Sequence, residues 1–238
     1  MVYLIEFACT GNNGRSPLAE TIGFDQAHTE YKDLFRPTQK IDVVSSGTKA
    51  EEIFNNTHPL EGKLWLMEKT LNYKGGELLF SEERKAIEEI LGMEEAEITE
   101  QYNENIEFRI KFQQCSNIIL KEASKEEQRH RNNYLSKRGL EATGQYNKQT
   151  IANKNTAIVL GVKDENTEVV KEIYSKAGIE PFAGIHTLTD YADMDELPDA
   201  FLRDNDEEVM ELYSQIEEAS RKSIDKFVED NYETLTRD

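Results

Sequence analysis

Residues 2–20 of the chain read VYLIEFAC (2–9) followed by TGNNGRSPLAE (10–20). The first part is a run of apolar, β-branched and aromatic residues, which is typical of a strand buried in a parallel sheet. The next residues are dense in Gly and Asn, as in a tight loop. Pro17 then fits the first turn of a helix, where its missing N–H costs nothing. The stretch therefore predicts a strand, a loop and a helix in immediate succession, with the helix ending at about His28.

Later stretches repeat this alternation of strand and helix. Strands are predicted at 41–46, 157–162 and 184–189, and a helix at about 165–177. A last long helix is predicted from about 206 to 232, with one apolar stripe and a very acidic outer face. Alternation of this kind predicts an α/β fold, a doubly wound four-stranded parallel sheet in flavodoxin-like order with helices on both faces.

The segment at about 50–127 breaks this alternation. It is rich in Glu and has mostly helical patterning, as at 81–93 and 105–129. We interpret it as an inserted helical subdomain, so that residues 1–49 and 128–238 together form the α/β domain. Its apolar residues must be buried against something. Two placements are open: a cap beside the active site, or an appendage on the flank that could form an oligomer interface.

The composition is strongly acidic. The chain holds 28 Lys and Arg against 47 Asp and Glu, a net charge of −19, and the excess lies in 51–127 and 193–238. A nucleic acid backbone requires a basic footprint on its partner, and anionic membrane surfaces require the same. We therefore expect neither a nucleic acid nor a membrane partner.

The cysteines and histidines give no indication of a disulfide-stabilised fold or of a metal site. The chain has two cysteines, Cys9 and Cys115, which make no disulfide framework. The N-terminus lacks the basic region of a signal peptide, and no stretch approaches the length of a membrane span, so a cytoplasmic protein is expected. The four histidines show no metal-ligand spacing, so no metal site is expected; they are His28, His58, His130 and His186. No cofactor is expected either.

The loop between the first strand and the first helix is suited to binding an oxyanion. In a doubly wound sheet it lies at the carboxyl end of a strand, where ligands bind. Consecutive backbone N–H groups in such a turn form an anion nest, and the following helix adds its positive N-terminal end. The residues that would contribute to the cradle are Thr10, Gly11, Asn12, Asn13 and Gly14.

Three side chains flanking the cradle supply chemistry. Helix N-termini and Arg stabilise a thiolate, which makes Cys9 a candidate nucleophile. Arg15, six residues on, can bind two phosphate oxygens with its planar fork. Ser16 could donate a hydrogen bond to the sulfur and help it leave as a thiolate. The alternative is that Cys9 is a buried cysteine at the end of a strand, with no chemical role. The functional interpretation is favoured by the sequence context, in which a strand, a Gly-rich loop, Arg, Ser and a Pro-initiated helix follow one another in register.

The loop also resembles a known signature. CTGNNGRSPLAE (9–20) is similar to the N-terminal signature of the low-molecular-weight protein tyrosine phosphatases, whose fold and loop also serve arsenate reductases. Further stretches that resemble the family are VVSSGT (43–48), RHRNNYLSKRGLEATG (129–144), NTAIVLGV (155–162) and LPDAF (197–201). The resemblance covers about residues 1–49 and 128–235, and the segment between them has no counterpart in it.

The resemblance implies a phosphate-monoester hydrolase that forms a cysteinyl-phosphate intermediate on Cys9, with the loop and Arg15 holding the oxygens. Asp199 matches the family's general acid, and Phe201 matches an aromatic residue that helps wall the substrate cleft, or else it anchors the last helix in the core. Asn12 and Ser45 match the hydrogen-bonded pair that supports the loop. The implied partner is a phosphorylated protein or a small phosphoester.

Two departures from the family pattern matter. The family's Asp-Pro is here Asp199-Ala200, so other carboxylates compete for the role of acid, namely Asp190, Asp193 and Asp195. Gly14 occupies a position that often holds a second cysteine, so no disulfide can protect Cys9 from oxidation within the loop.

Two other functions stay open at this point. An arsenate reductase on the same fold would need resolving thiols, and the chain offers only Cys115, in an apolar helical context. A non-catalytic protein that binds a phosphorylated ligand would keep the cradle without turnover, but it would have no need of both Cys9 and Asp199.

Overall fold

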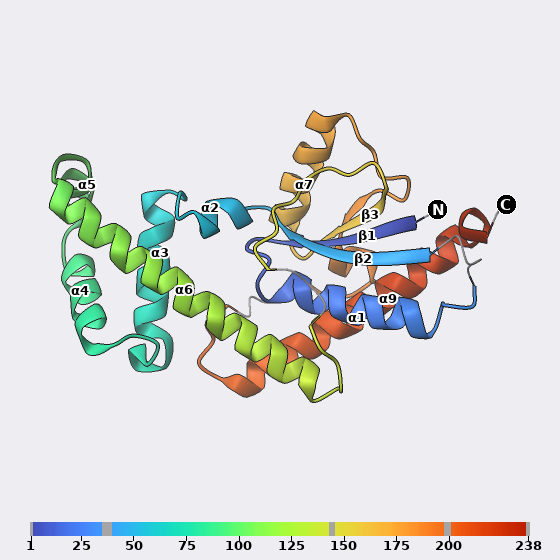
Figure 1. Cartoon of the computed structure of the whole chain (residues 1–238), viewed down its shortest axis with the longest axis horizontal. Coiled ribbons are helices and arrows are strands. Elements are labelled where there is room, and N and C mark those ends of the chain that lie inside the picture. Colours follow the sequence, from blue (N-terminus) through green and yellow to red (C-terminus); the bar gives the residue numbers. More distant parts are fainter. Residues whose placement is uncertain (1, 35–39, 143–145, 198–200, 237–238) are drawn as a thin grey trace. The chain divides into compact units, whose positions relative to one another are not determined.

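The structure is a computed structural model of the whole chain, and it describes residues 2–34, 40–142, 146–197 and 201–236. The chain divides into two compact units, which are described separately below (Figure 1).

The first unit comprises Met1–Glu51, His130–Ala200 and Glu207–Asp238, and it contains a four-stranded sheet. The strands are β1 (Val2–Cys9), β2 (Lys40–Gly47), β3 (Thr156–Gly161) and β4 (Ile185–Thr187), in the order β2-β1-β3-β4. All neighbouring strands are parallel. The predicted doubly wound α/β fold is therefore confirmed, and β1 is a central strand that carries Cys9 at its carboxyl end.

Helices cover both faces of this sheet. α1 (Arg15–Thr29) and α9 (Asp206–Thr236) lie on one face, and α7 (Asp164–Ala177) lies on the other (Figure 1). The alternation of side chains along β1 explains this arrangement, because successive residues of a strand point to opposite faces. Ile5, Phe7 and Cys9 join the core formed with α1 and α9, whereas Ala8 packs with Val159, Val170 and Tyr174 on the side of α7.

The fourth strand is shorter than the sequence predicts. The expected strand at 184–189 is reduced to Ile185–Thr187, which pairs with Val159–Gly161. The chain then turns into the short helix α8 (Leu188–Tyr191), in which Leu188 and Tyr191 are buried. Burial of these two side chains in the core replaces further pairing at the sheet edge.

The second unit comprises Glu52–Arg129 and Phe201–Asp206, and its first segment is helical. After α2 (Ala50–Phe54), its elements are α3 (Leu60–Asn72), the 3-10 helix η1 (Tyr73–Gly76), α4 (Ser81–Leu91), α5 (Glu95–Glu104) and α6 (Ile106–Ser136). A hydrophobic core of its own contains Met67, Tyr73, Ile87, Phe112 and Ile119. The helical character predicted for about 50–127 is confirmed. The boundary between the units falls within α6, which continues to Ser136.

Residues 201–206 belong to the second unit, although the sequence analysis assigns all of 128–238 to the α/β domain. The Leu202 side chain is buried in the helical core. The Phe201 ring stacks on Trp65, with ring centroids 5.8 Å apart and an interplanar angle of 22°. Six residues without a periodic pattern could not reveal this placement in the sequence.

Candidate active site

Cys9 is the last residue of β1, and its side chain is 3% exposed. Two groups of the following residues donate hydrogen bonds to its sulfur: the backbone N–H of Asn12 at 3.3 Å and the Ser16 hydroxyl at 2.9 Å. The Ser16 hydroxyl also lies 3.1 Å from the Ser46 carbonyl oxygen, so its single proton has two acceptors within reach. A negatively charged sulfur is the stronger acceptor of the two. Two hydrogen-bond donors are thus directed at the Cys9 sulfur.

Asn12 connects the loop to the residues that surround it. It is fully buried, and its φ of 54° lies in the left-handed region, which Asn adopts more readily than most residues. Its side-chain amide donates to the Ser45 hydroxyl at 2.9 Å and to the Ser16 hydroxyl at 3.3 Å. The same side chain accepts a hydrogen bond from the backbone N–H of Lys148 at 3.3 Å. These bonds hold the backbone of Asn12 in the conformation that directs its N–H at the sulfur.

The support for the loop extends to a carboxyl group in α1. The Ser45 hydroxyl donates to Glu20 at 2.6 Å, so Glu20, Ser45 and Asn12 form one chain of hydrogen bonds. Burial raises the pKa of the Glu20 carboxyl, and the hydrogen bond from Ser45 opposes that rise. The pairing of Asn12 with Ser45 that the resemblance implies is present, and Glu20 is an addition that sequence reasoning did not single out.

Arg15 is the first residue of α1, directly after the loop, and its side chain is 9% exposed. The remaining cradle residues, Thr10 to Gly14, connect the end of β1 to this helix N-terminus. Asn13 is 3% exposed and donates from its side-chain amide to the Gly11 carbonyl oxygen at 3.2 Å. The candidate nucleophile Cys9, the loop and Arg15 therefore lie in one short segment between a strand and a helix of the first unit.

The end of β2 lies against the loop at very short range. A Cβ atom on Gly47 would stand 2.9 Å from both the Asn12 nitrogen and the Thr10 carbonyl oxygen. The backbone N–H groups of Thr48 and Lys49 donate to the carbonyl oxygens of Cys9 and Thr10, at 2.8 and 2.9 Å. Only a residue without a side chain fits at position 47, and the loop is fixed from this side by backbone contacts.

Arg131 is a member of the site that the sequence analysis missed. Its side chain is completely buried, and its Nη1 donates a hydrogen bond to the carbonyl oxygen of Asn13 at 2.8 Å. The guanidinium carbon also lies 4.4 Å from the centroid of the Tyr146 ring. A buried arginine of α6 is thus hydrogen-bonded to the backbone of the loop. The helical sequence around Arg131 does not indicate this contact.

Asn166 is a second residue that the sequence analysis missed. It lies in the first turn of α7 and is 4% exposed. Its side-chain amide donates to the hydroxyl of Thr10 at 3.1 Å and lies 3.4 Å from the hydroxyl of Thr48. Asn166 therefore connects the cradle to the turn after β2. In the sequence, only its position just after β3 indicates that it could lie near the loop.

The predicted acid, Asp199, lies outside the described residues. Its three competitors, Asp190, Asp193 and Asp195, are all exposed in the first unit. Phe201 belongs to the second unit, where its ring stacks on Trp65.

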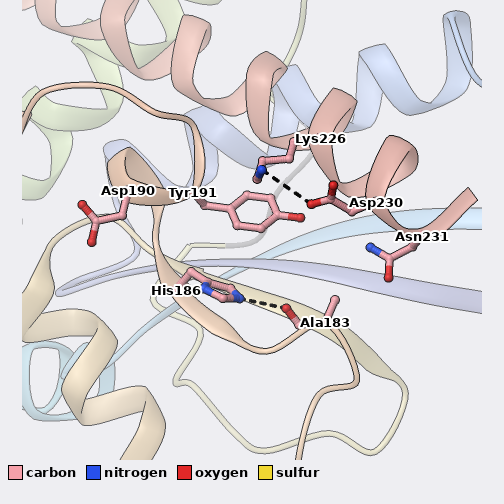
Figure 2. A pocket seen from close by; sticks show the side chains of 7 residues that line it. All are labelled: Ala183, His186, Asp190, Tyr191, Lys226, Asp230 and Asn231. Atoms are coloured by element: carbon pink, nitrogen blue, oxygen red, sulfur yellow. Dashed lines mark hydrogen bonds and ion pairs between the residues drawn. The ribbon is translucent and has the colours of Figure 1, made fainter.

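A separate hollow of about 450 Å³ lies between β4, α8 and α9, and Figure 2 shows the side chains around it. Lys226 forms an ion pair with Asp230 at 3.6 Å, and a ring nitrogen of His186 lies 2.9 Å from the Ala183 carbonyl oxygen (Figure 2). Another hollow of about 530 Å³ is lined by residues that include Glu6, Lys148 and Ile151. Neither hollow is lined by residues 9–16, so neither is the cradle.

Within the described ranges, no three His, Cys, Asp or Glu residues are grouped so that they could hold a metal ion. The same part of the chain contains no helix that is long and apolar enough to cross a membrane.

Comparisons of the sequence give no match, either to a family model or to a curated protein. Comparison of the structure gives solved proteins of similar fold. YfkJ from Bacillus subtilis is 16% identical, with a TM-score of 0.48, over 98% of this chain and 97% of that one. The YwlE arginine phosphatase from Geobacillus stearothermophilus is 14% identical, with a TM-score of 0.48, over 97% and 96%.

Wzb from Vibrio vulnificus, solved in complex with benzylphosphonate, is 13% identical, with a TM-score of 0.47, over 94% of this chain and 98% of that one. The chain is thus similar in structure to proteins that include a phosphatase, and its loop sequence resembles the low-molecular-weight protein tyrosine phosphatases.

Proposed function

We propose that this protein is a phosphate-monoester hydrolase of the low-molecular-weight protein tyrosine phosphatase type, with Cys9 as its nucleophile. The observation that carries the proposal is the pair of hydrogen bonds to the Cys9 sulfur, from the Asn12 N–H and the Ser16 hydroxyl. Donors aimed at a cysteine sulfur stabilise the thiolate, which is the reactive form. The sulfur also lies at the start of a loop followed by a helix N-terminus, where an oxyanion binds.

The first chemical step is transfer of the phosphoryl group to sulfur. The Cys9 thiolate attacks phosphorus, an S–P bond forms and the bond from phosphorus to the ester oxygen breaks. The loop amides and the Arg15 guanidinium bind the three non-bridging oxygens, and the planar fork of Arg15 suits two of them at once. Asp199 gives its proton to the leaving oxygen, so the alcohol departs without negative charge.

The second step releases phosphate. Asp199, now a carboxylate, takes a proton from water as the water oxygen attacks phosphorus, and the S–P bond breaks with its electrons returning to sulfur. The Ser16 hydroxyl stabilises the thiolate that leaves in this step. The products are inorganic phosphate and the original thiolate, with the proton of water held by Asp199.

The acidic surface bears on the substrate. A net charge of −19 repels anionic phosphoproteins at long range, although salt screens this repulsion beyond about 8–10 Å. A small phosphorylated molecule or a basic phosphopeptide is compatible with such a surface. We propose substrates of these two kinds.

Arsenate reduction is less well supported, because the second thiol is poorly suited to it. Cys115 belongs to the core of the helical unit and is 5% exposed. Burial raises the pKa of its thiol, which keeps it protonated and weakly nucleophilic. A titration of free thiols after exposure to arsenate separates the two functions, since a reductase would lose thiols and a phosphatase would not.

Turnover of aryl phosphate by three forms of the protein tests the proposal. Cys9→Ser should bind phosphate or vanadate about as well as the native protein but hydrolyse aryl phosphate negligibly. Arg15→Ala should lose both binding and rate, because the guanidinium acts in the ground state and the transition state. If Cys9→Ser retained most of the activity, the covalent mechanism would be wrong.

A further inference from the structure

The hollow of about 530 Å³ in the first unit, here called the Glu6 hollow, has no part in the chemistry proposed for Cys9. Glu6, Lys148 and Ile151 are among the residues that line it, and every residue of its lining belongs to the first unit. Sites for small molecules have volumes of about 300–1,000 Å³. The Glu6 hollow is therefore large enough for a small molecule, and its geometry does not depend on the helical unit.

Apolar side chains form part of the walls of the Glu6 hollow. Leu4 is two residues before Glu6 on β1, so the two side chains lie on the same face of the sheet. Val44 of β2 pairs with Glu6 in the parallel register and also lines the hollow. Half-buried or exposed side chains supply the apolar surface, namely Leu4, Val44, Ile151 and Ile179. An apolar ligand that covers them is favoured, because contact removes both surfaces from water.

Glu6 supplies a buried carboxyl group to the lining. The residue is 5% exposed, and its two carboxyl oxygens accept one hydrogen bond each, from Ser46 at 2.5 Å and from Tyr174 at 2.8 Å. A carboxylate oxygen can accept a second hydrogen bond. In the described part of the chain, no ion pair joins Glu6 to a basic side chain, and burial raises the pKa of its carboxyl group. A ligand with an ammonium group would supply the cation that Glu6 lacks.

Two lysines bring positive charge to the same hollow. Lys148 and Lys154 line it, both are exposed, and neither forms an ion pair within the described ranges. They offer a counter-charge to a carboxylate in a chain whose net charge is −19. A simple cation would meet these lysines, and a simple anion would meet Glu6 and Glu51. The lining is therefore complementary to a zwitterion.

Hydrogen bonds connect Glu6 to the sulfur of Cys9. The Ser46 hydroxyl donates to Glu6, and the Ser46 carbonyl oxygen lies 3.1 Å from the Ser16 hydroxyl. The Ser16 hydroxyl in turn donates to the Cys9 sulfur at 2.9 Å. A ligand that keeps Glu6 ionised strengthens the hydrogen bond from Ser46, because bonds to a charged acceptor are the stronger ones, and so helps to fix Ser46 beside Ser16.

Lys148 connects the hollow to the loop by a second route. Its backbone N–H donates to the side-chain oxygen of Asn12 at 3.3 Å. Its carbonyl oxygen accepts a hydrogen bond from the backbone N–H of Gly47 at 2.8 Å. A ligand bound to the Lys148 ammonium group would restrict the conformations of a residue that already supports the loop.

We propose that the Glu6 hollow binds a zwitterion with an apolar side chain, of the class of the free aliphatic amino acids, and that this ligand strengthens oxyanion binding by the Cys9 loop. The ammonium group of the ligand binds Glu6, its carboxylate binds Lys148, and its side chain covers Leu4 and Val44. The site itself is independent of the proposed function, whereas the effect on the loop rests on it.

Isothermal titration calorimetry of the full chain with L-leucine tests the site. Saturable binding is expected, with a Kd on the order of 0.1 mM. Isopentylamine lacks the carboxylate of leucine and isocaproate lacks its ammonium group, so each should bind at least about 10-fold more weakly. Absence of saturable binding of L-leucine up to about 10 mM would overturn the site. Either fragment binding as tightly as L-leucine would overturn the assignment to a zwitterion.

Variants of the lining locate the ligand. Glu6→Gln and Lys148→Met should each weaken binding of L-leucine by about 10- to 100-fold, as expected for loss of a charge-assisted hydrogen bond. Glu168→Gln and Lys171→Met are the matched controls and should bind it like the native protein, because they change the net charge equally but break an ion pair of α7 outside the hollow. Lys148 is exposed, so Lys148→Met gives a result even if Glu6→Gln does not fold. Native affinity in Lys148→Met would overturn the placement of the ligand.

Inorganic phosphate tests the effect on the loop. Saturating L-leucine should tighten phosphate binding by about 5-fold, and saturating phosphate should tighten binding of L-leucine by the same factor, because coupling between two sites is reciprocal. Unchanged affinities would overturn the effect on the loop and leave the site in place. A native protein that binds L-leucine but no phosphate would contradict the proposed function, and the effect on the loop with it, while the site would stand.

Discussion

Arg131 donates a hydrogen bond from Nη1 to the backbone carbonyl oxygen of Asn13, at 2.8 Å, from a side chain that is completely buried. The two residues are 118 positions apart in the chain, and both belong to the first unit. The bond links a cation to the part of the loop that would hold a substrate anion. If the loop binds phosphate, as we propose, this positive charge would favour the bound anion.

Replacing Arg131 should therefore weaken both the fold and the cradle. Hydrogen bonds to charged groups contribute about 1.5–3 kcal/mol, so Arg131→Met should lower the free energy of unfolding by about that amount. Urea unfolding measures this loss, and repeating it with phosphate present should show less stabilisation by phosphate than in the native protein. Arg131→Lys keeps the charge but not the planar fork, so it should retain more phosphate binding than Arg131→Met. Equal phosphate stabilisation in all three proteins would show that Arg131 has only a structural role.

Ser16 should affect the second chemical step more than the first. Its hydroxyl donates to the Cys9 sulfur at 2.9 Å, and loss of a hydrogen bond to a charged group corresponds to about 10- to 100-fold in rate. Ser16→Ala should therefore slow breakdown of the cysteinyl-phosphate by about that factor. Rapid mixing with p-nitrophenyl phosphate should show a burst of p-nitrophenol followed by a slow steady rate.

Ser220→Ala is the matched control for Ser16→Ala. Ser220 is also fully buried, but its hydroxyl donates to a carbonyl oxygen within α9, so its replacement should leave the kinetics unchanged. A Ser16→Ala protein with a lower rate and no burst would place the effect in the first step instead.

Gly47 should tolerate no side chain. A Cβ atom there would meet two backbone atoms of the loop at 2.9 Å, and backbone cannot move aside as the end of a side chain can. Gly47→Ala should displace the loop at Asn12, and we expect a loss of at least about 10²-fold in kcat/KM on aryl phosphate. Gly62→Ala is the control, because its nearest neighbour is a side-chain atom of His58 at 3.2 Å. Activity of Gly47→Ala within a few-fold of the native protein would show that the loop adapts.

Sequence patterns were sufficient for the local part of the site. The strand that ends at Cys9, the Gly-rich loop and the helix from Arg15 follow one another in the chain, so their order and type could be predicted from composition and spacing. The partnership of Asn12 with Ser45 came from the family resemblance, and both residues lie in segments that resemble the family.

Long-range contacts could not be predicted in the same way. Arg131 and Asn166 lie in helices whose patterning shows only which face is apolar, and nothing in it specifies contact with residues 10–13. Residues 201–206 are too few to show a period, and Trp65 and Lys74, which they contact, lie in the insertion, for which the family resemblance offers no guide.

Glu6 should make the stability of the first unit depend on pH. Glu6 is 5% exposed, and its carboxyl group accepts hydrogen bonds from Ser46 at 2.5 Å and from Tyr174 at 2.8 Å. Burial raises its pKa above 4.5, and the two hydrogen bonds oppose that rise without cancelling it. Between pH 4.5 and the folded pKa, the folded state therefore binds more protons than the unfolded state, and the contribution of Glu6 to stability is lost as pH rises through the folded pKa.

Glu6→Gln removes this titration, so unfolding in urea between about pH 4 and pH 8 should distinguish the two proteins. The free energy of unfolding of the variant minus that of the native protein should increase with pH from about 4.5 upward and then become constant, by about 1.4 kcal/mol for each unit by which the pKa is raised. Tyr174→Phe removes a donor that favours the carboxylate, so the pH-dependent loss should be larger in that variant than in the native protein. A difference between Glu6→Gln and the native protein that stays constant across this range would show that Glu6 does not titrate differently in the folded and unfolded states.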